Sequence, residues 1–373
     1  MDAGIGPNDA VLLAGPDGDI IYSKHADKPL TPASTLKLLT ALFAFHHLGS
    51  DFRFQTEFFQ DADGNIYIKG YGDPLLISEE IEWICSVLGP KIEKINNLFL
   101  DDLYFRQPIM IPGIKNSAEP YDAPNGALCV NFNTVFFRTV DGIAQSAEKQ
   151  TPILPLAIAK IRKTRLKQGR IILSHSRNEI LQYAGEMFQY FLKAHGTPVL
   201  GEIHPKGIDG RSAQKIFKHR SRHTLERVVA KLLEFSNNFI ANQVLLTVGA
   251  EVHGPPAGLN KAAAAMHRYA ADVLNMTTLE IVEGSGISRR NKISANDMLS
   301  VLKAFEPHHR LMRRNGNEWY KTGTLDGIST RAGYIQDDDT RLYKYVVFLN
   351  SSSGTNAELQ VNHLIQWVIN SKP

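Results

Sequence analysis

Three short polar motifs lie far apart in this 373-residue chain, and their spacing is the feature that most constrains its fold. They are Ser34-Thr35-Leu36-Lys37, Ser236-Asn237-Asn238 and Lys321-Thr322-Gly323-Thr324. A serine with a nearby lysine, a second serine with an amide, and a Lys-Thr-Gly segment are the groups of a lysine-assisted serine acyl-transfer site. One site needs all three, although 202 positions (236 − 34) separate Ser34 from Ser236. The chain must therefore leave the domain that holds the site and return to it.

The context of the first motif favours Ser34 over other copies of the pattern. Ser-x-x-Lys also begins at Ser146, Ser212 and Ser300, and Ser-x-Asn also begins at Ser176 and Ser294. The segment from Thr31 predicts a helix start, with Pro32 in its first turn and Gly49 as its end. Apolar residues cover almost the whole circumference of this helix, so we expect burial on all sides. Lys37 then lies one turn after Ser34, where burial favours the neutral amine. The alternative is a core helix whose lysine extends to solvent.

The other two motifs fit the same interpretation. Ser236-Asn237-Asn238 falls between predicted helices at 225–233 and 239–248, where a simple helix cap is the alternative. Lys321-Thr322-Gly323 lies in a predicted strand, and a glycine there lets a ligand backbone approach closely. An edge strand at this place can pair with an extended peptide. The alternative is an ordinary strand that ends at a glycine turn.

The order and setting of these motifs resemble the penicillin-binding protein and serine β-lactamase superfamily. Within it, the chain is similar to the low-molecular-mass class C penicillin-binding proteins, the D-alanyl-D-alanine carboxypeptidase/endopeptidase family. Longer matching segments lie at 30–38, 70–76 (Gly-Tyr-Gly-Asp-Pro-Leu-Leu), 121–124, 131–133 and 284–289 (Gly-Ser-Gly-Ile-Ser-Arg). Two positions depart from the family's pattern: Asn237 stands where Asp is also common, and Glu283 stands where Asp is usual.

The resemblance implies a serine-type D-Ala-D-Ala carboxypeptidase, with possible endopeptidase activity, that acts on peptidoglycan stem peptides and is covalently inhibited by β-lactams. It implies Ser34 as the nucleophile, neutral Lys37 as the proton acceptor and Ser236 as the proton relay. It also implies that Asn238 holds the substrate amide and the lysine, and that Lys321 attracts the terminal carboxylate. The implied substrate-binding residues are Thr322, Gly323 and Thr324. A β-lactamase of the same fold and a non-catalytic binding or assembly protein are the alternatives.

The expected fold is α+β. A β-lactamase/transpeptidase-like domain, an antiparallel sheet flanked by helices, would comprise residues 1–50 and 206–373. An inserted mixed α/β region would comprise residues 51–205. The strand patterns at 331–335 and 343–350, and the apolar face of a terminal helix, support the antiparallel sheet.

Composition narrows the remaining classes. The net charge of +3 is small and dispersed, so we expect no nucleic-acid partner. The basic runs Lys160–Arg170 and Lys215–Arg222 predict solvated surface, with attraction to an anionic polymer such as the cell wall as the alternative. No apolar run reaches the roughly 18 residues of a membrane span. Cys85 and Cys129 predict two buried thiols, with one disulfide as the alternative.

Two further expectations concern metals and location. His219 and His223 are spaced like helical metal ligands, but an acidic third ligand is not apparent, so we expect no metal and no cofactor. Residues Met1–Gly4 show neither the basic nor the apolar region of a signal peptide. The resemblance nevertheless implies an extracytoplasmic protein, of the periplasm or cell envelope, whose signal is absent from this chain. Cytoplasmic residence is the alternative, and the sequence does not indicate an oligomeric state.

Overall fold

The computed structural model describes residues 5–210, 212–351 and 356–370. The chain divides into two compact units. The first comprises Met1–Gly49, Val229–Val248 and Leu259–Pro373, and the second comprises Ser50–Val228 and Gly249–Gly258. The chain thus leaves the first unit after the segment that carries Ser34 and returns to it before Ser236. Residues Met1–Gly4, on which the signal-peptide expectation rests, lie outside the described residues.

The first unit is built on an antiparallel sheet with the strand order β13-β14-β15-β16-β1-β2. Its strands are β1 (Asp9–Ala14), β2 (Ile20–Lys24), β13 (Arg313–Asn315), β14 (Glu318–Leu325), β15 (Ile328–Gln336) and β16 (Leu342–Leu349). Two short strands, β11 (Leu279–Glu280) and β12 (Lys292–Ile293), pair separately. The helices of the first unit are α1 (Lys37–Leu48), α5 (Leu225–Phe235), α6 (Asn238–His253), α7 (Leu259–Leu274), α8 (Ala295–Phe305) and α9 (Ala357–Asn370). The first residues of α5 and the last residues of α6 belong to the second unit.

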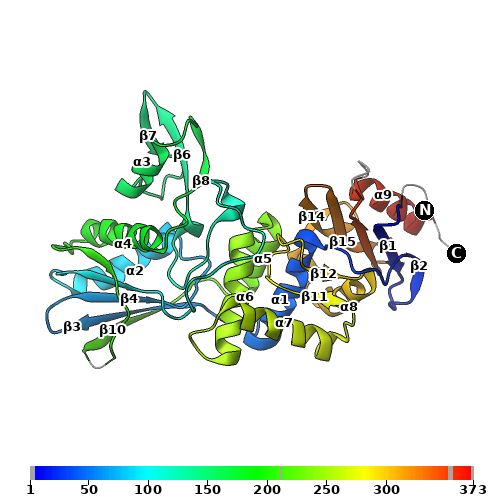
Figure 1. The fold of residues 1–373 in the computed structure, drawn as a ribbon, viewed down its shortest axis with the longest axis horizontal. Coiled ribbons are helices and arrows are strands. Elements are labelled where there is room, and N and C mark those ends of the chain that lie inside the picture. Colours follow the sequence, from blue (N-terminus) through cyan, green and yellow to red (C-terminus); the bar gives the residue numbers. More distant parts are fainter. Residues whose placement is uncertain (1–4, 211, 352–355, 371–373) are drawn as a thin grey trace. The chain divides into compact units, whose positions relative to one another are not determined.

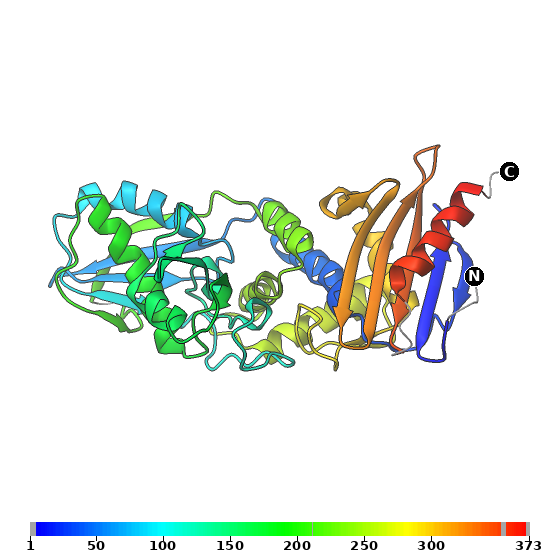
Figure 2. The same cartoon turned by 90° about the horizontal axis from the view of Figure 1, so that it is seen from above.

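Helices cover both faces of this sheet, as the sequence predicts. Helix α9 lies across one face (Figure 2), where Val361 and Leu364 join a buried cluster with Val11 of β1 and other strand residues. Helix α8 packs on the sheet as well, and Tyr334 of β15 donates a hydrogen bond to the Leu302 carbonyl of α8 at 2.6 Å. Apolar side chains alternate along the strands, so each face has its own helical cover.

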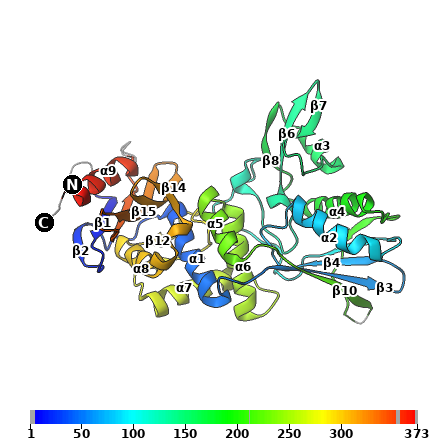
Figure 3. The same cartoon turned by 180° about the vertical axis from the view of Figure 1, so that it is seen from behind.

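The second unit holds a mixed sheet with the order β10-β3-β4-β5-β9. Its strands are β3 (Gln55–Asp61), β4 (Ile66–Gly70), β5 (Leu98–Asp101), β9 (Ile203–Pro205) and β10 (Ala213–Arg220). Helices α2 (Ser78–Leu88) and α4 (Arg177–Ala194) lie side by side on one face of it (Figure 1), with a core that includes Phe58, Ile84 and Phe188. A small sheet of β6 (Thr134–Val140), β7 (Ile143–Ser146) and β8 (Gln168–Ile172) stands beside α3 (Pro155–Ile161), apart from the larger sheet (Figure 3).

Strand β10 belongs to the second unit, although it lies beyond the predicted end of the inserted region. We predicted a return near residue 206, but β10 pairs with β3 along its length, with Lys218 opposite Glu57 and His219 opposite Thr56. The lysine and arginine side chains of this basic run are exposed, as the solvated-surface interpretation predicts, but the segment is a sheet strand, and its Lys215 forms an ion pair with Glu57 at 2.9 Å. Pattern reasoning missed this because basic residues obscure the strand's alternation. We now place the end of the insertion near residue 228, and the domain assignment itself stays a proposal.

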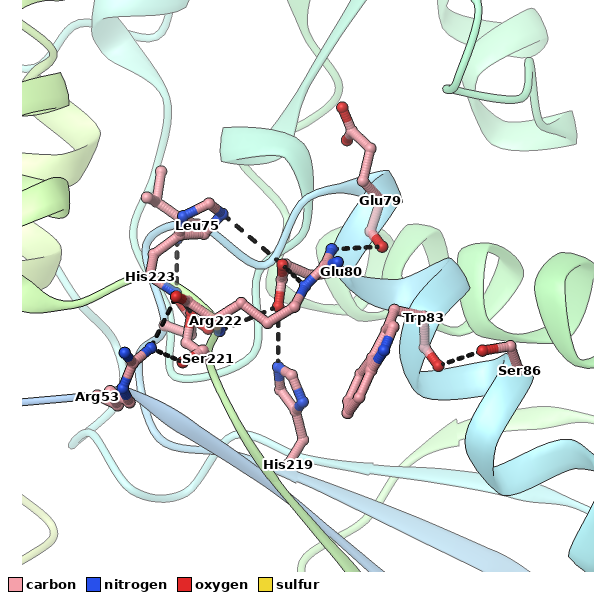
Figure 4. Close-up of polar contacts among 11 residues, drawn as sticks. Arg53, Leu75, Glu79, Glu80, Trp83, Ser86, His219, Ser221, Arg222 and His223 are labelled. Carbon is pink, nitrogen blue, oxygen red and sulfur yellow. Dashed lines mark hydrogen bonds and ion pairs between the residues drawn. The ribbon is translucent and has the colours of Figure 1, made fainter.

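A buried carboxylate joins β10 to α2 in this unit. Glu80 is fully buried, and its oxygens lie 2.6 Å from Arg222 Nε and 3.2 Å from His219 Nε2 (Figure 4). Arg53 donates to the carbonyl groups of Ser221 and Arg222 and holds the same segment. Burial alone would raise the pKa of Glu80, but contacts with His219 and Arg222 outweigh it and lower the pKa. The charged carboxylate therefore stabilises the fold wherever the pH lies above this pKa.

We expect Glu80→Gln to lower the free energy of unfolding by about 3 kcal/mol at pH 7, the low end for a broken buried ion pair, because Arg222 is half exposed. Urea denaturation followed by circular dichroism measures the change, with Glu79→Gln as the matched control at a half-buried neighbour. The difference should shrink as the pH falls through the pKa of Glu80, since a protonated carboxyl resembles the amide. Equal stability of the two variants at pH 7 would contradict the structural role of Glu80.

Three further expectations meet the structure here. Cys85 and Cys129 are both free and buried, as the thiol interpretation predicts. The described residues contain no group of three His, Cys, Asp or Glu side chains arranged to hold a metal ion, and the expectation of no metal stays a prediction. Within the same described ranges, no helix has both the length and the apolar composition that crossing a membrane requires.

Candidate active site

The Ser34 motif begins a buried helix in the first unit. Residues Ala33–Leu36 form a 3-10 turn, and α1 follows directly from Lys37. Gly49 ends the helix with a φ of 78°, a conformation that glycine adopts without strain. The side chains of residues 37–44 are buried around the whole circumference, which confirms the helix that the sequence predicts. Only the first turn differs, because it is 3-10 rather than α-helical.

Lys37 is the centre of the site's hydrogen bonds. Its side chain is fully buried, and Nζ lies 2.8 Å from Ser34 Oγ, 2.8 Å from Asn238 Oδ1 and 2.7 Å from the Ser285 carbonyl oxygen. A carbonyl oxygen and an amide oxygen can only accept, so Lys37 must donate both of those bonds. Ser34 is different because its hydroxyl can donate as well as accept. When Lys37 is neutral, its lone pair therefore remains for the Ser34 hydroxyl proton.

The pKa of Lys37 allows this side chain to accept the Ser34 hydroxyl proton. Burial lowers the pKa of Lys37 from 10.5 to about 7, against the opposing attraction of the Glu283 carboxylate. A substantial fraction of the amine is then neutral near pH 7, and a pKa near the working pH is the value that an efficient general base needs. The alternative interpretation, a lysine that extends to solvent, is wrong because the side chain is fully buried.

A second serine–lysine pair lies in the same unit. Ser236 occupies the turn between α5 and α6, and Lys321 of β14 donates from Nζ to Ser236 Oγ at 2.7 Å and to the Thr322 carbonyl at 2.6 Å. Burial lowers the pKa of Lys321, and the positive charges of Lys37 and Arg313 act in the same direction. A bound anion would act in the opposite direction and favour the charged form of Lys321.

The Ala33–Leu36 turn and β14 are in direct contact at Gly323. A Cβ at this glycine would lie 2.7 Å from the Ser34 backbone nitrogen and 2.4 Å from Thr330 Oγ1, so no larger residue fits without movement. Thr330 of β15 also donates to the Pro32 carbonyl at 2.8 Å and thereby fixes the turn to the sheet. Gly323 thus serves the approach of the protein's own backbone, whereas we expected it to admit a ligand.

Two residues of the site have strained backbones. Ala33, which precedes Ser34, has a φ of 47°, and Ser236 has a φ of 51°. Side chains other than glycine rarely adopt such values, and residues of this kind cluster at functional sites, where the surrounding structure holds them. Ala33 is fully buried and Ser236 is bonded to Lys321, so both are held by their neighbours.

The loop after β11 completes the site, and sequence reasoning missed its part. Its Ser285 carbonyl accepts from Lys37, and its Gly284 carbonyl accepts from Thr40 Oγ1 of α1 at 2.6 Å. We had noted Glu283 only as a departure from a family pattern. Glu283 directly precedes Gly284-Ser285-Gly286, at the start of a segment that resembles the family. This position could have indicated that its carboxylate organises the loop. A backbone acceptor such as the Ser285 carbonyl cannot be identified from a sequence motif, because every residue has a carbonyl group.

The structure brings the predicted residues together in two connected groups, Ser34–Lys37–Asn238 and Ser236–Lys321. Thr322 is half-buried and Thr324 is exposed on β14, beyond the lysine. The competing motifs have other partners: Ser294 caps α8 in a capping box with Asp297, and Lys215 is bonded to Glu57. The roles of the eight predicted residues stay proposals, while their placement supports the choice of Ser34 over the other copies.

Comparisons with known proteins agree with this site. The model of the D-Ala-D-Ala carboxypeptidase 3 (S13) family matches residues 10–171 and 169–314. A D-alanyl-D-alanine carboxypeptidase from Actinomadura sp. (strain R39) is 25% identical over 421 residues, which cover 92% of this chain and 78% of that protein. The chain therefore belongs to the S13 family of D-Ala-D-Ala carboxypeptidases, a family of serine peptidases, and the resemblance inferred from the motifs is confirmed.

Solved structures show the same fold. Penicillin-binding protein 4 (dacB) from Haemophilus influenzae has a TM-score of 0.79 at 19% identity, with 97% of each chain covered, and it has also been solved with a β-lactam. A predatory peptidoglycan endopeptidase from Bdellovibrio bacteriovorus has a TM-score of 0.56 at 17% identity, covering 97% of this chain and 92% of that one. The predicted α+β fold of the transpeptidase type is confirmed.

Proposed function

We propose that this protein is a serine-type D-Ala-D-Ala carboxypeptidase that acts on peptidoglycan stem peptides through an acyl-enzyme on Ser34. The observation that carries the proposal is the set of hydrogen bonds around Lys37, whose neutral form directs its lone pair to the Ser34 hydroxyl. Membership of the S13 family supports the choice of substrate.

The first half of the reaction is acylation. Ser34 Oγ attacks the carbonyl carbon between the two D-alanines while neutral Lys37 takes the hydroxyl proton. The C–N bond then breaks, and the departing D-alanine amine receives a proton by way of Ser236, whose hydroxyl is bonded to Lys321. The products of this half are free D-alanine and an ester between Ser34 and the shortened peptide.

The substrate carries negative charge at two places, the oxyanion that forms during attack and the terminal carboxylate, and the site offers donors for each. We assign the oxyanion hole to the backbone amides of Ser34 and Thr324, and each such donor typically contributes a factor of about 10² to 10³. The terminal carboxylate lies along β14, where Lys321, Thr322 and Thr324 offer an ammonium and two hydroxyl groups. Binding of that carboxylate acts to raise the pKa of Lys321 and so favours the ammonium form that attracts it. Asn238 orients both the substrate amide and Lys37.

In the second half, water hydrolyses the ester and frees Ser34. A β-lactam forms the same ester but keeps its leaving group attached, so we expect a long-lived adduct. Endopeptidase activity on cross-linked peptides uses the same chemistry, and the peptide chosen in the test decides between the two. Because peptidoglycan lies outside the cytoplasmic membrane, we also propose an extracytoplasmic location, in the periplasm or cell envelope.

The test is to mix the protein with benzylpenicillin and follow its intact mass over time, with Ser34→Ala alongside. We expect a persistent adduct on the native protein and none on the variant, together with release of D-alanine from a peptide ending in D-Ala-D-Ala. Rapid penicillin hydrolysis without an adduct would favour a β-lactamase. Neither adduct nor turnover would favour a non-catalytic protein that kept the fold, and an adduct on Ser34→Ala would move the nucleophile elsewhere.

A further inference from the structure

The carboxylate of Glu283 is the most heavily bonded buried charge near the site. Its side chain is fully buried. One oxygen, Oε2, accepts from Ser285 N at 2.7 Å, Ser285 Oγ at 2.6 Å and Asn242 Nδ2 at 3.1 Å. The other, Oε1, accepts from Gly286 N at 2.7 Å, Asn291 Nδ2 at 2.6 Å and Ser288 N at 3.3 Å. Six hydrogen bonds therefore converge on this one carboxylate, three from backbone N–H groups and three from side chains.

These bonds shape the loop that holds Lys37. Three of the six donors are backbone N–H groups of residues 285, 286 and 288, so the loop is wrapped around the carboxylate. Wrapping turns the Ser285 carbonyl toward Lys37 Nζ and the Gly284 carbonyl toward Thr40. Asn242 of α6 fixes the other side, because its Oδ1 accepts from Gly284 N at 2.8 Å. The Glu283 loop thus connects α6 to α1, the helix that carries Lys37 and Thr40.

We propose that Glu283 is a positioning residue for Lys37: its carboxylate fixes the carbonyl that holds the amine, and its negative charge keeps that amine basic enough to take a proton. This inference rests on the proposed acylation of Ser34. When Lys37 accepts the Ser34 proton, an ammonium forms in a buried place, where isolated charge is unfavourable. The nearby anion stabilises that ammonium and so favours the proton transfer.

Few other charges act on Lys37. Lys321 of β14 is the charged group that faces it from the sheet, and Arg313 of β13 acts in turn on Lys321. Burial opposes protonation of Lys37, and the attraction of the Glu283 carboxylate favours it. Glu283 is therefore the counter-charge that acts against the effect of burial. Removing it should therefore make Lys37 a weaker base that loses its proton at lower pH.

The test compares Glu283→Gln with the native protein in the rate of benzylpenicillin acylation from pH 5 to pH 9. In the native protein we expect the rate to rise with pH through about 7, as Lys37 becomes neutral. In Glu283→Gln we expect this rise to move to lower pH by about one unit. We also expect a plateau that is lower by about tenfold, because a weaker base takes the proton less readily. A ¹³C NMR titration of the lysine side chains, assigned with Lys37→Met, reports the same shift without any acylation.

Two matched variants separate charge from structure. Glu283→Asp keeps the charge and should keep the native pH dependence, whatever it costs in rate. The double variant Glu283→Gln/Asn242→Asp moves the negative charge to the partner side chain of the existing hydrogen bond, and it should restore most of the native pH dependence. It also serves as the test if Glu283→Gln alone fails to fold.

The outcomes are distinguishable. A pH profile and an NMR titration that are unchanged in Glu283→Gln would overturn the role of Glu283 and leave the proposed function intact. A native protein that is not acylated would overturn the proposed function itself. A lower plateau with no movement along the pH axis would reduce Glu283 to a structural residue and also overturn the inference.

Discussion

Replacing Lys37 with methionine should slow acylation of Ser34 by benzylpenicillin by about 10³-fold, within the range that a general base contributes. Methionine has nearly the length of lysine and suits a buried position, so the helix should remain folded. What is lost is the lone pair that faces the Ser34 hydroxyl, at a distance of 2.8 Å in the native protein. The residual rate should no longer rise with pH through 7. Rapid-quench mass spectrometry across this pH range measures both effects.

A second Ser-x-x-Lys copy provides the control. Lys303 follows Ser300 on α8 at the same spacing, but its side chain is exposed. Lys303→Met should leave both the rate and its pH dependence unchanged. If Lys37→Met were acylated as fast as the native protein, another group would have to take the proton, and the assignment of Lys37 as the base would be wrong.

The second large effect is expected at Gly286, two residues before Ser288 in the loop around Glu283. A Cβ there would lie 1.9 Å from the Ala33 carbonyl oxygen and 3.1 Å from the Ser34 nitrogen. Gly286 also has a φ of 82°, which costs other residues about 1 to 2 kcal/mol. Gly286→Ala must therefore displace either the loop or the Ala33–Leu36 turn. We expect acylation to fall by about 10²-fold, the cost of a misplacement of about 1 Å.

Gly49 separates the two causes of this loss. It has a similar φ of 78°, but nothing lies within 4 Å of the position that its Cβ would take. Gly49→Ala should lower stability in a thermal melt by the conformational cost alone and leave acylation at its native rate. If Gly286→Ala were acylated as fast as Gly49→Ala, the loop would not be needed to place Ser34.

The sequence predicted the parts of the site that side chains carry. The sequence around each motif predicts its helical or strand context. This context allowed the choice of Ser34, Lys37, Ser236 and Lys321. The antiparallel sheet followed from alternating strands, and the insertion followed from the spacing of the motifs. These features depend on local patterns, which the folded chain preserves.

The features that escaped prediction depend on the backbone or on distant partners. Lys37 is held partly by the Ser285 carbonyl, and no residue type indicates where a carbonyl points. Strand β10 was missed because basic residues obscure its alternation, and their acidic partners, Glu57 for Lys215 and Glu80 for His219, lie on other elements. The strain at Ala33 and Ser236 is likewise set by tertiary contacts rather than by local preference.

Parts of the site and of the first unit's sheet are far apart along the chain, so the site can be completed only late in synthesis. Lys321 lies 287 positions (321 − 34) after Ser34 along the chain. At about 5 to 20 residues per second, a ribosome needs about 15 to 60 s to cover that interval. Strand β1 must wait still longer, because its partner β16 ends at Leu349. A nascent chain therefore carries Ser34 without Lys321 for most of its elongation. If Ser34 is the nucleophile that we propose, acylation should become detectable only when translation is almost complete.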